Sequence, residues 1–145
     1  MNAGPGMLRI ITTVLAAIVL FLSVVIGAWL ATPSIQLLTP VSLEYDKTTQ
    51  RFKFIRKVNT KGPIEANWLM QAYARNGELQ CNASGHSTYE TAYSFVEYPA
   101  PPQLLPCLED PKFYMVVAWE VELFGFIPLR PTFLRVPPEQ TGSSP

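Results

Sequence analysis

Charge is missing from a long part of this sequence: no Asp, Glu, Lys or Arg lies between Arg9 and Glu44. Inside this gap, residues 10–30 read IITTVLAAIVLFLSVVIGAWL and are almost wholly apolar. A helix of about 20 apolar residues spans the ~30 Å hydrocarbon core of a bilayer, whereas a helix of a soluble domain needs a polar face. We therefore expect one transmembrane helix at residues 10–31, preceded by a cytoplasmic segment at residues 1–9.

Basic residues are also scarce beyond the apolar run, since none follows Arg9 until Lys47. Basic residues collect on the cytoplasmic side of a membrane helix. This pattern predicts a single-pass protein of the cell membrane, with its N-terminus in the cytoplasm and its C-terminal domain periplasmic or extracellular. The apolar run is longer than the about 7 to 15 residues of a cleaved signal peptide. An uncleaved signal-anchor is therefore favoured, and cleavage after Ala28 is the alternative.

An excess of either charge is absent, because 11 basic and 11 acidic residues give the 145-residue chain a formal net charge of zero. Nucleic-acid-binding domains normally carry a basic excess, so we expect no nucleic-acid partner. The chain also lacks a nucleotide-binding motif, a Cys-x-x-Cys pair and any histidine other than His86. We therefore expect no cofactor, no metal ion and no enzymatic activity.

Cysteine is limited to Cys81 and Cys107. An even number of cysteines outside the cytoplasm indicates a disulfide, and closing a loop of this size would stabilise the domain by about 3 kcal/mol. The alternatives are a free or redox-active pair, a metal site that would need a carboxylate besides the two cysteines and His86, and a membrane-bound hydrolase that uses Cys81 as nucleophile and His86 as base. We expect the disulfide to join two layers of the domain.

The rest of the chain predicts an all-β domain. Its 14 prolines suit turns, edge strands and loops, and apolar residues alternate with polar ones in two segments, 51–58 and 113–123. A further strand or hairpin arm is expected within residues 87–98, among six or seven strands in all. We predict a small immunoglobulin-like antiparallel β-sandwich at residues 41–136, joined to the helix by an extended linker at residues 32–40 and followed by a disordered tail at residues 137–145.

The dipeptide Asn76-Gly77 lies between two segments of strand-forming residues. Both residues tolerate the positive φ angles of a type I′ turn, which predicts a two-residue hairpin. Pairing would then place Ala72 opposite Cys81 and Tyr73 opposite Gln80.

Three groups of residues are candidates for binding. The first group is a row of small residues on one face of the predicted membrane helix, Ser23, Gly27 and Ala31, which recur every four positions. They would allow a second helix to approach closely. The alternative is that they have no such role, because small residues are common in any membrane helix. The second group is a basic cluster that comprises Arg51, Lys53, Arg56, Lys57 and Lys61. These residues could bind lipid headgroups or an acidic partner. Alternatively, they pair with the acidic second half of the domain or protect an edge strand from aggregation.

The third group surrounds a glycine bend near the end of the domain. Exposed, these residues would form an apolar surface for a partner or the bilayer, and buried, they would cap the sandwich; they are Phe124, Phe126, Ile127, Leu129 and Arg130.

These features predict an accessory or structural subunit of a membrane protein assembly, which acts by protein–protein binding through its helix and its β-domain. Its expected partners are other membrane subunits and the lipid bilayer, and self-association into a homo-oligomer is left open. The alternative is a tethered or secreted β-sandwich that binds a small ligand or glycan through tyrosines, namely Tyr89, Tyr93 and Tyr98.

Overall fold

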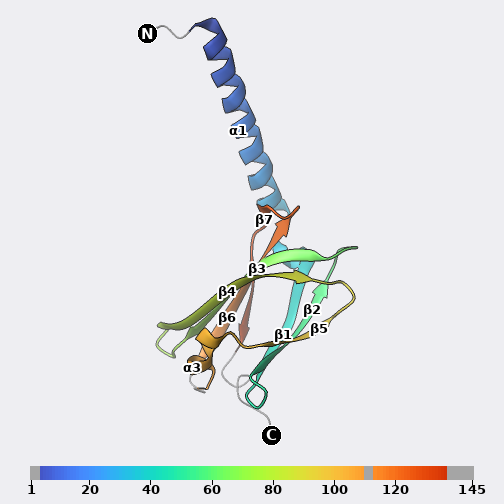
Figure 1. Cartoon of the computed structure of the whole chain (residues 1–145), viewed down its shortest axis with the longest axis vertical. Helices are drawn as coiled ribbons and strands as arrows, with labels where there is room; N and C mark the ends of the chain where they lie inside the picture. Colours follow the sequence, from blue (N-terminus) through green and yellow to red (C-terminus); the bar gives the residue numbers. More distant parts are fainter. Residues whose placement is uncertain (1–3, 110–112, 137–145) are drawn as a thin grey trace.

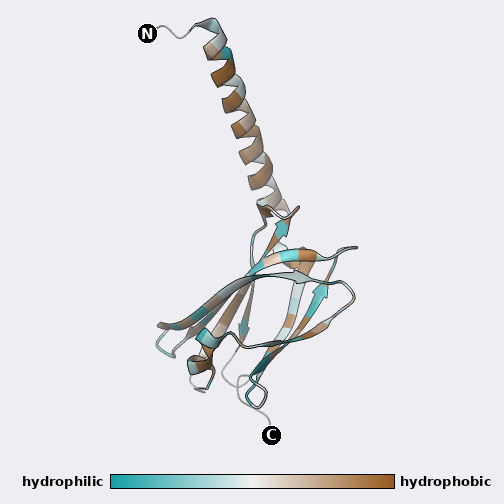
Figure 2. Cartoon of the chain, in the orientation of Figure 1, coloured by the Kyte–Doolittle hydropathy of each residue, from teal (hydrophilic) through white to brown (hydrophobic). Residues whose placement is uncertain are grey.

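The computed structural model describes residues 4–109 and 113–136, which form one long helix followed by a β-domain (Figure 1). Helix α1 (Pro5–Ala31) has no buried residue, and apolar residues cover most of its length (Figure 2). At about 1.5 Å per residue it is about 40 Å long. It is therefore long and apolar enough to cross a membrane. The predicted tail at residues 137–145 lies outside the described residues.

The β-domain consists of two antiparallel sheets, which confirms the all-β prediction. The first sheet has the order β1-β2-β5, with β1 (Leu38–Asp46), β2 (Arg51–Val58) and β5 (Phe95–Pro99). The second has the order β4-β3-β6-β7, with β8 also paired to β6; its strands are β3 (Ile64–Tyr73), β4 (Leu79–Tyr89), β6 (Tyr114–Leu123), β7 (Ile127–Pro128) and β8 (Thr132–Val136). Within the part of the chain that the structure describes, β7 and β8 pair only with β6, as expected for strands that contain or follow prolines.

The core lies between the two sheets. The ring of Phe54 in β2 stacks on the indole of Trp119 in β6, with ring centroids 4.8 Å apart, and the Trp119 Nε1–H donates to the Tyr89 hydroxyl oxygen at 3.1 Å. Alternation predicts that every second residue from Phe113 to Leu123 points inward. The middle four are buried, namely Met115, Val117, Trp119 and Val121, whereas Phe113 and Leu123 at the two ends are half-buried. The period-two pattern therefore located this strand and its buried face correctly.

The predicted extended linker at residues 32–40 is wrong. The chain instead forms the short helix α2 (Ser34–Leu37), and β1 begins at Leu38. Ser34 is completely buried; its backbone N–H donates to the carbonyl oxygen of Arg130 at 2.8 Å, and its Oγ accepts from the Val121 N–H at 2.9 Å. These bonds fix the junction between α1 and the β-domain.

The hairpin between β3 and β4 has the predicted register at Ala72↔Cys81, but a bulge places Tyr73 opposite Leu79 instead of Gln80. The turn type is also different, because Gly77 has a φ of 84° while its N–H donates to the carbonyl oxygen of Ala74 at 2.9 Å. This is a three-residue loop in which a type I turn precedes a left-handed glycine, not a two-residue type I′ turn.

The predicted strand within residues 87–98 is interrupted. β4 ends at Tyr89, residues 90–94 cross to the other sheet, and β5 begins at Phe95. After β5, the proline-rich segment forms two short helical turns, η1 (Pro102–Leu104) and α3 (Leu105–Leu108).

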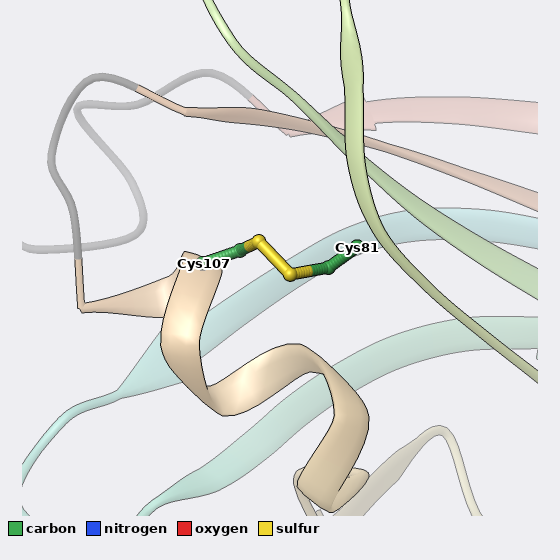
Figure 3. Close-up of a disulfide and its surroundings, with 2 residues drawn as sticks. All are labelled: Cys81 and Cys107. Atoms are coloured by element: carbon green, nitrogen blue, oxygen red, sulfur yellow. A yellow bond between two sulfur atoms is a disulfide. The ribbon is translucent and has the colours of Figure 1, made fainter.

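Cys81 and Cys107 form a disulfide, with their Cα atoms 6.3 Å apart (Figure 3). Cys81 lies in β4 and Cys107 lies in α3. The bond therefore ties the edge of the five-stranded sheet to the helical connection before β6, and the prediction that it joins the two sheets is wrong.

Candidate functional site

The turn between β6 and β7, formed by Phe124, Gly125 and Phe126, exposes two aromatic rings. The φ angles of Phe124 and Gly125 are 55° and 75°, and the Phe126 N–H donates to the carbonyl oxygen of Leu123 at 3.3 Å, as in a type I′ turn. The exposed fractions of Phe124 and Phe126 are 80% and 63%. A bulky residue rarely adopts this left-handed conformation, so the turn presents Phe124 at a cost in backbone strain.

This Phe124–Phe126 turn lies at the end of the domain from which α1 extends. β7, which follows the turn directly, contacts α1 (Figure 1), and Ala28 near the end of α1 packs against the core. A groove of about 530 Å³ opens beside the turn and is lined in part by apolar residues of α2, β3 and β6. The exposed rings are thus adjacent to the end of the apolar helix.

The other apolar residues predicted for this surface are not exposed. Ile127 and Leu129 are buried, and the Leu129 N–H donates to the carbonyl oxygen of Val121 at 2.9 Å. Arg130 is exposed. The exposed and the buried alternatives therefore each apply to part of the segment. Ile127 and Leu129 cover the core, while Phe124, Phe126 and Arg130 remain available to a partner.

The small residues predicted to pack against another helix lie on an open face of α1. Ser23, Gly27 and Ala31 are all exposed, and a Cβ added at Gly27 would meet no atom of the described chain within 4 Å. The Ser23 hydroxyl donates to the carbonyl oxygen of Val19 within the same helix, at 2.8 Å. A helix partner at this face stays a prediction.

The predicted basic cluster is divided by the fold. Arg51 lies 3.9 Å from a carboxylate oxygen of Glu97 in β5, and Lys53 lies 3.8 Å from Asp46 in β1. The Arg51–Glu97 contact confirms part of the expected pairing between the basic and acidic halves of the domain. The expectation that the basic residues protect an edge strand is wrong, because β2 is the middle strand of its sheet.

Arg56 does not belong to a surface patch. Its exposed fraction is 3%, whereas Lys57 and Lys61 are exposed. Strand alternation explains this position, because Phe52, Phe54 and Arg56 occupy every second residue of β2 and all three point inward. The sequence carried this signal, since the same alternation that identified the apolar face includes Arg56.

The guanidinium of Arg56 has few partners. Its carbon lies 5.2 Å from the centroid of the Tyr89 ring, and Nη2 donates to the carbonyl oxygen of Glu90 at 3.3 Å. Nε and Nη1 are buried and have no hydrogen-bond partner among the residues that the structure describes. Burial lowers the pKa of Arg56, but a guanidinium remains charged in proteins.

Arg56 and two of the three predicted tyrosines line a cavity of about 360 Å³ between the sheets. Tyr89 and Tyr98 contribute to its wall, while Tyr93 is 62% exposed and lies outside it. Burial raises the pKa of Tyr89 to about 12.

Sequence reasoning missed a cluster on the outer face of the five-stranded sheet. His86 in β4 lies 3.8 Å from Glu65 in β3 and 4.0 Å from Glu122 in β6, and Asn67 donates to Glu122 at 2.7 Å. These residues are far apart in the sequence and meet only through strand pairing. His86 and Glu65 are exposed, and we assign no metal ion to them.

The described residues thus form an exposed aromatic turn and a cavity beside Arg56, and they do not support thiol chemistry. Cys81 is in a disulfide and has no thiol for nucleophilic attack, which removes the hydrolase alternative built on Cys81 and His86. Compared with known proteins, the chain matches no protein-family model and no curated sequence.

Proposed function

We propose that this chain is a single-pass, membrane-anchored accessory or structural subunit of a membrane protein assembly. In this proposal the N-terminus lies in the cytoplasm, and an immunoglobulin-like β-domain lies on the periplasmic or extracellular side. The domain binds a neighbouring subunit through the Phe124–Phe126 turn, beside the bilayer surface. The observation that carries the proposal is the exposure of Phe124, in a left-handed conformation, next to the end of α1.

The energetics of this turn favour an external partner. A left-handed conformation costs a residue such as Phe124 roughly 1 kcal/mol, and an 80% exposed ring recovers little of this cost inside the chain. Burying a phenylalanine side chain stabilises a protein by about 1.5–3 kcal/mol. The rings of Phe124 and Phe126 therefore gain this stabilisation only where another surface covers them.

The junction supports a role beside the membrane. The buried Ser34 is hydrogen-bonded to Arg130 and Val121, so the Phe124–Phe126 turn is held at a fixed position relative to the end of α1. The Cys81–Cys107 disulfide supports an oxidising, extracytoplasmic compartment for the domain, because disulfides are rare in the cytosol.

Co-purification of partners tests the proposal. The tagged full-length chain is extracted from its native membrane in a mild detergent, and the proteins that co-purify are identified by mass spectrometry. Phe126→Asp should remove the partner subunit, because a charge cannot occupy an apolar contact without a large desolvation penalty. Phe133→Asp is the matched control, since Phe133 in β8 is 64% exposed against 63% for Phe126.

A second variant examines the helix. Gly27→Ile adds side-chain atoms where the described chain leaves open space, so a loss of co-purification would report packing against another helix. Retention of the partner in both Phe126→Asp and Gly27→Ile would overturn the proposal. Equal loss in Phe126→Asp and Phe133→Asp would show that the Phe124–Phe126 turn is not the specific contact.

A further inference from the structure

We infer that the cavity between the two sheets is a binding site for a small organic anion, a carboxylate with an apolar or aromatic body, and that Arg56 binds its carboxylate. This inference does not depend on the membrane-assembly proposal.

The cavity lies where the two sheets are not joined. β4 and β5 are edge strands of different sheets, and both contribute residues to the wall. The volume of about 360 Å³ falls within the range of roughly 300–1,000 Å³ that is typical of small-molecule sites. The main side chains of the wall are Phe54, Arg56, Trp68, Tyr89, Tyr98 and Trp119.

The charge of Arg56 indicates the sign of the ligand. A buried charge is strongly unfavourable unless an opposite charge and hydrogen bonds compensate for it. No carboxylate lies within ion-pair distance of Arg56 in residues 4–109 and 113–136. The carbonyl oxygen of Glu90 and the ring of Tyr89 compensate only in part, and Nε and Nη1 keep unpaired N–H groups. A carboxylate would supply both the charge and the acceptors.

The aromatic wall indicates the rest of the ligand. The two indole N–H groups are already used, since Trp68 donates to Ser87 at 3.0 Å and Trp119 donates to Tyr89 at 3.1 Å. The indole of Trp119 is covered by Phe54, so the half-buried indole of Trp68 is the one that offers its apolar surface to a ligand. A glycan would need many hydrogen-bonding partners, whereas an anion with an apolar body needs only those that Arg56 provides. The geometry thus favours the organic anion over a sugar.

The position of Trp68 depends on Gly85, its partner in β4. A Cβ at Gly85 would lie 2.5 Å from a ring atom of Trp68, so only glycine lets this indole lie across the neighbouring strand. The backbone of β4 and the indole of Trp68 together form this part of the wall.

Isothermal titration calorimetry with two probes of nearly equal shape tests the inference on the full chain in detergent. Naphthalene-2-carboxylate carries the charge, and naphthalene-2-carboxamide does not. We expect the wild-type chain to bind the carboxylate at least tenfold more tightly. Arg56→Gln should abolish this preference, whereas Lys57→Gln, which changes the adjacent exposed cation, should preserve it.

Each probe partitions into the detergent micelles to the same extent whichever variant is present. Comparing one probe across the variants therefore cancels this contribution to the measured heat. Equal affinity of the wild-type chain for both probes would overturn the inference, as would the absence of saturable binding. Persistence of the carboxylate preference in Arg56→Gln would show that another group binds the anion. If Arg56→Gln fails to fold, as judged by circular dichroism, the two probes are compared on the wild-type chain after the heat of each probe with protein-free micelles has been subtracted.

Discussion

Phe124 combines a left-handed backbone conformation with an exposed ring, and this combination is unfavourable for an isolated chain. Asn followed by Gly is the preferred pair in a type I′ turn. We therefore expect Phe124→Asn to raise the free energy of unfolding by about 1 kcal/mol, measured by chemical denaturation of the detergent-solubilised chain. A decrease would show that the ring of Phe124 is stabilised within the chain itself.

Ser34 is a single residue on which the helix–domain junction depends. Ser34→Ala removes the acceptor for the buried Val121 N–H, and an unsatisfied buried donor costs about 1–3 kcal/mol. We expect the free energy of unfolding to fall by this amount. Ser84→Ala, at an exposed position of β4, is the control and should change stability by less than about 0.5 kcal/mol.

For single residues, the sequence predicted burial correctly where the direction of a side chain follows from strand alternation. Arg56 could have been assigned to the inner face, because it continues the spacing of Phe52 and Phe54. Because four other basic residues lie close to Arg56 in the sequence, Arg56 was grouped with them instead of with the apolar face. The exposure of Phe124 could not be predicted, since the apolar segment around it is divided between surface and core by contacts with β6.

Among the elements, β4 and α3 are joined by the disulfide. Removing it with the double variant Cys81→Ala/Cys107→Ala should lower the free energy of unfolding by about 3 kcal/mol, chiefly because the unfolded chain regains freedom. Denaturant titration with and without reductant measures this effect. The reductant should destabilise the wild-type chain and leave the double variant unchanged; an equal response of both would contradict the structural role of the bond.

Local signals defined the elements well and their ends poorly. The pairing of Ala72 with Cys81 was predictable because the apolar faces of β3 and β4 require it. The turn type was not, because Asn76-Gly77 suits both a two-residue and a three-residue loop. The short helix α2 was hidden for a different reason, since it depends on hydrogen bonds from Ser34 to β6 and to Arg130.

Across the whole molecule, buried tyrosines make stability sensitive to high pH. Burial raises the pKa of Tyr89 to about 12 and also raises the pKa of Tyr98, whereas an unfolded tyrosine titrates near pH 10. Above about pH 10 the unfolded chain therefore releases protons that the folded chain retains. The free energy of unfolding should fall with rising pH by about 1.4 kcal/mol per unit for each such tyrosine, and should not respond to these groups below pH 9.

Denaturant titrations at several pH values between about 8 and 11 check this slope. Tyr89→Phe should reduce it by no more than about half, because burial also raises the pKa values of Tyr98 and Tyr45. Tyr93→Phe, at an exposed position, should leave it unchanged. An equal slope in all three proteins would contradict the assignment to Tyr89.

The overall architecture was only partly predictable. The long apolar helix and an antiparallel β-domain follow from composition and alternation, which are local properties. The division of strands between two sheets does not, because β4 and β5 are consecutive in the chain and yet pair with strands of different sheets. The cavity beside Arg56 results from this crossing, so it could not be located from the sequence.

The hydrogen-bonded junction at Ser34 has a mechanical consequence. Because hydrogen bonds of Ser34 tie the chain just after α1 to Val121 and Arg130, a change in the tilt of the helix would move the β-domain with it. Displacement is greatest at the end of the domain that is most distant from α1, where the turn between β1 and β2 lies (Figure 1). A neighbouring subunit that contacts only α1 could in this way move the distant end of the β-domain.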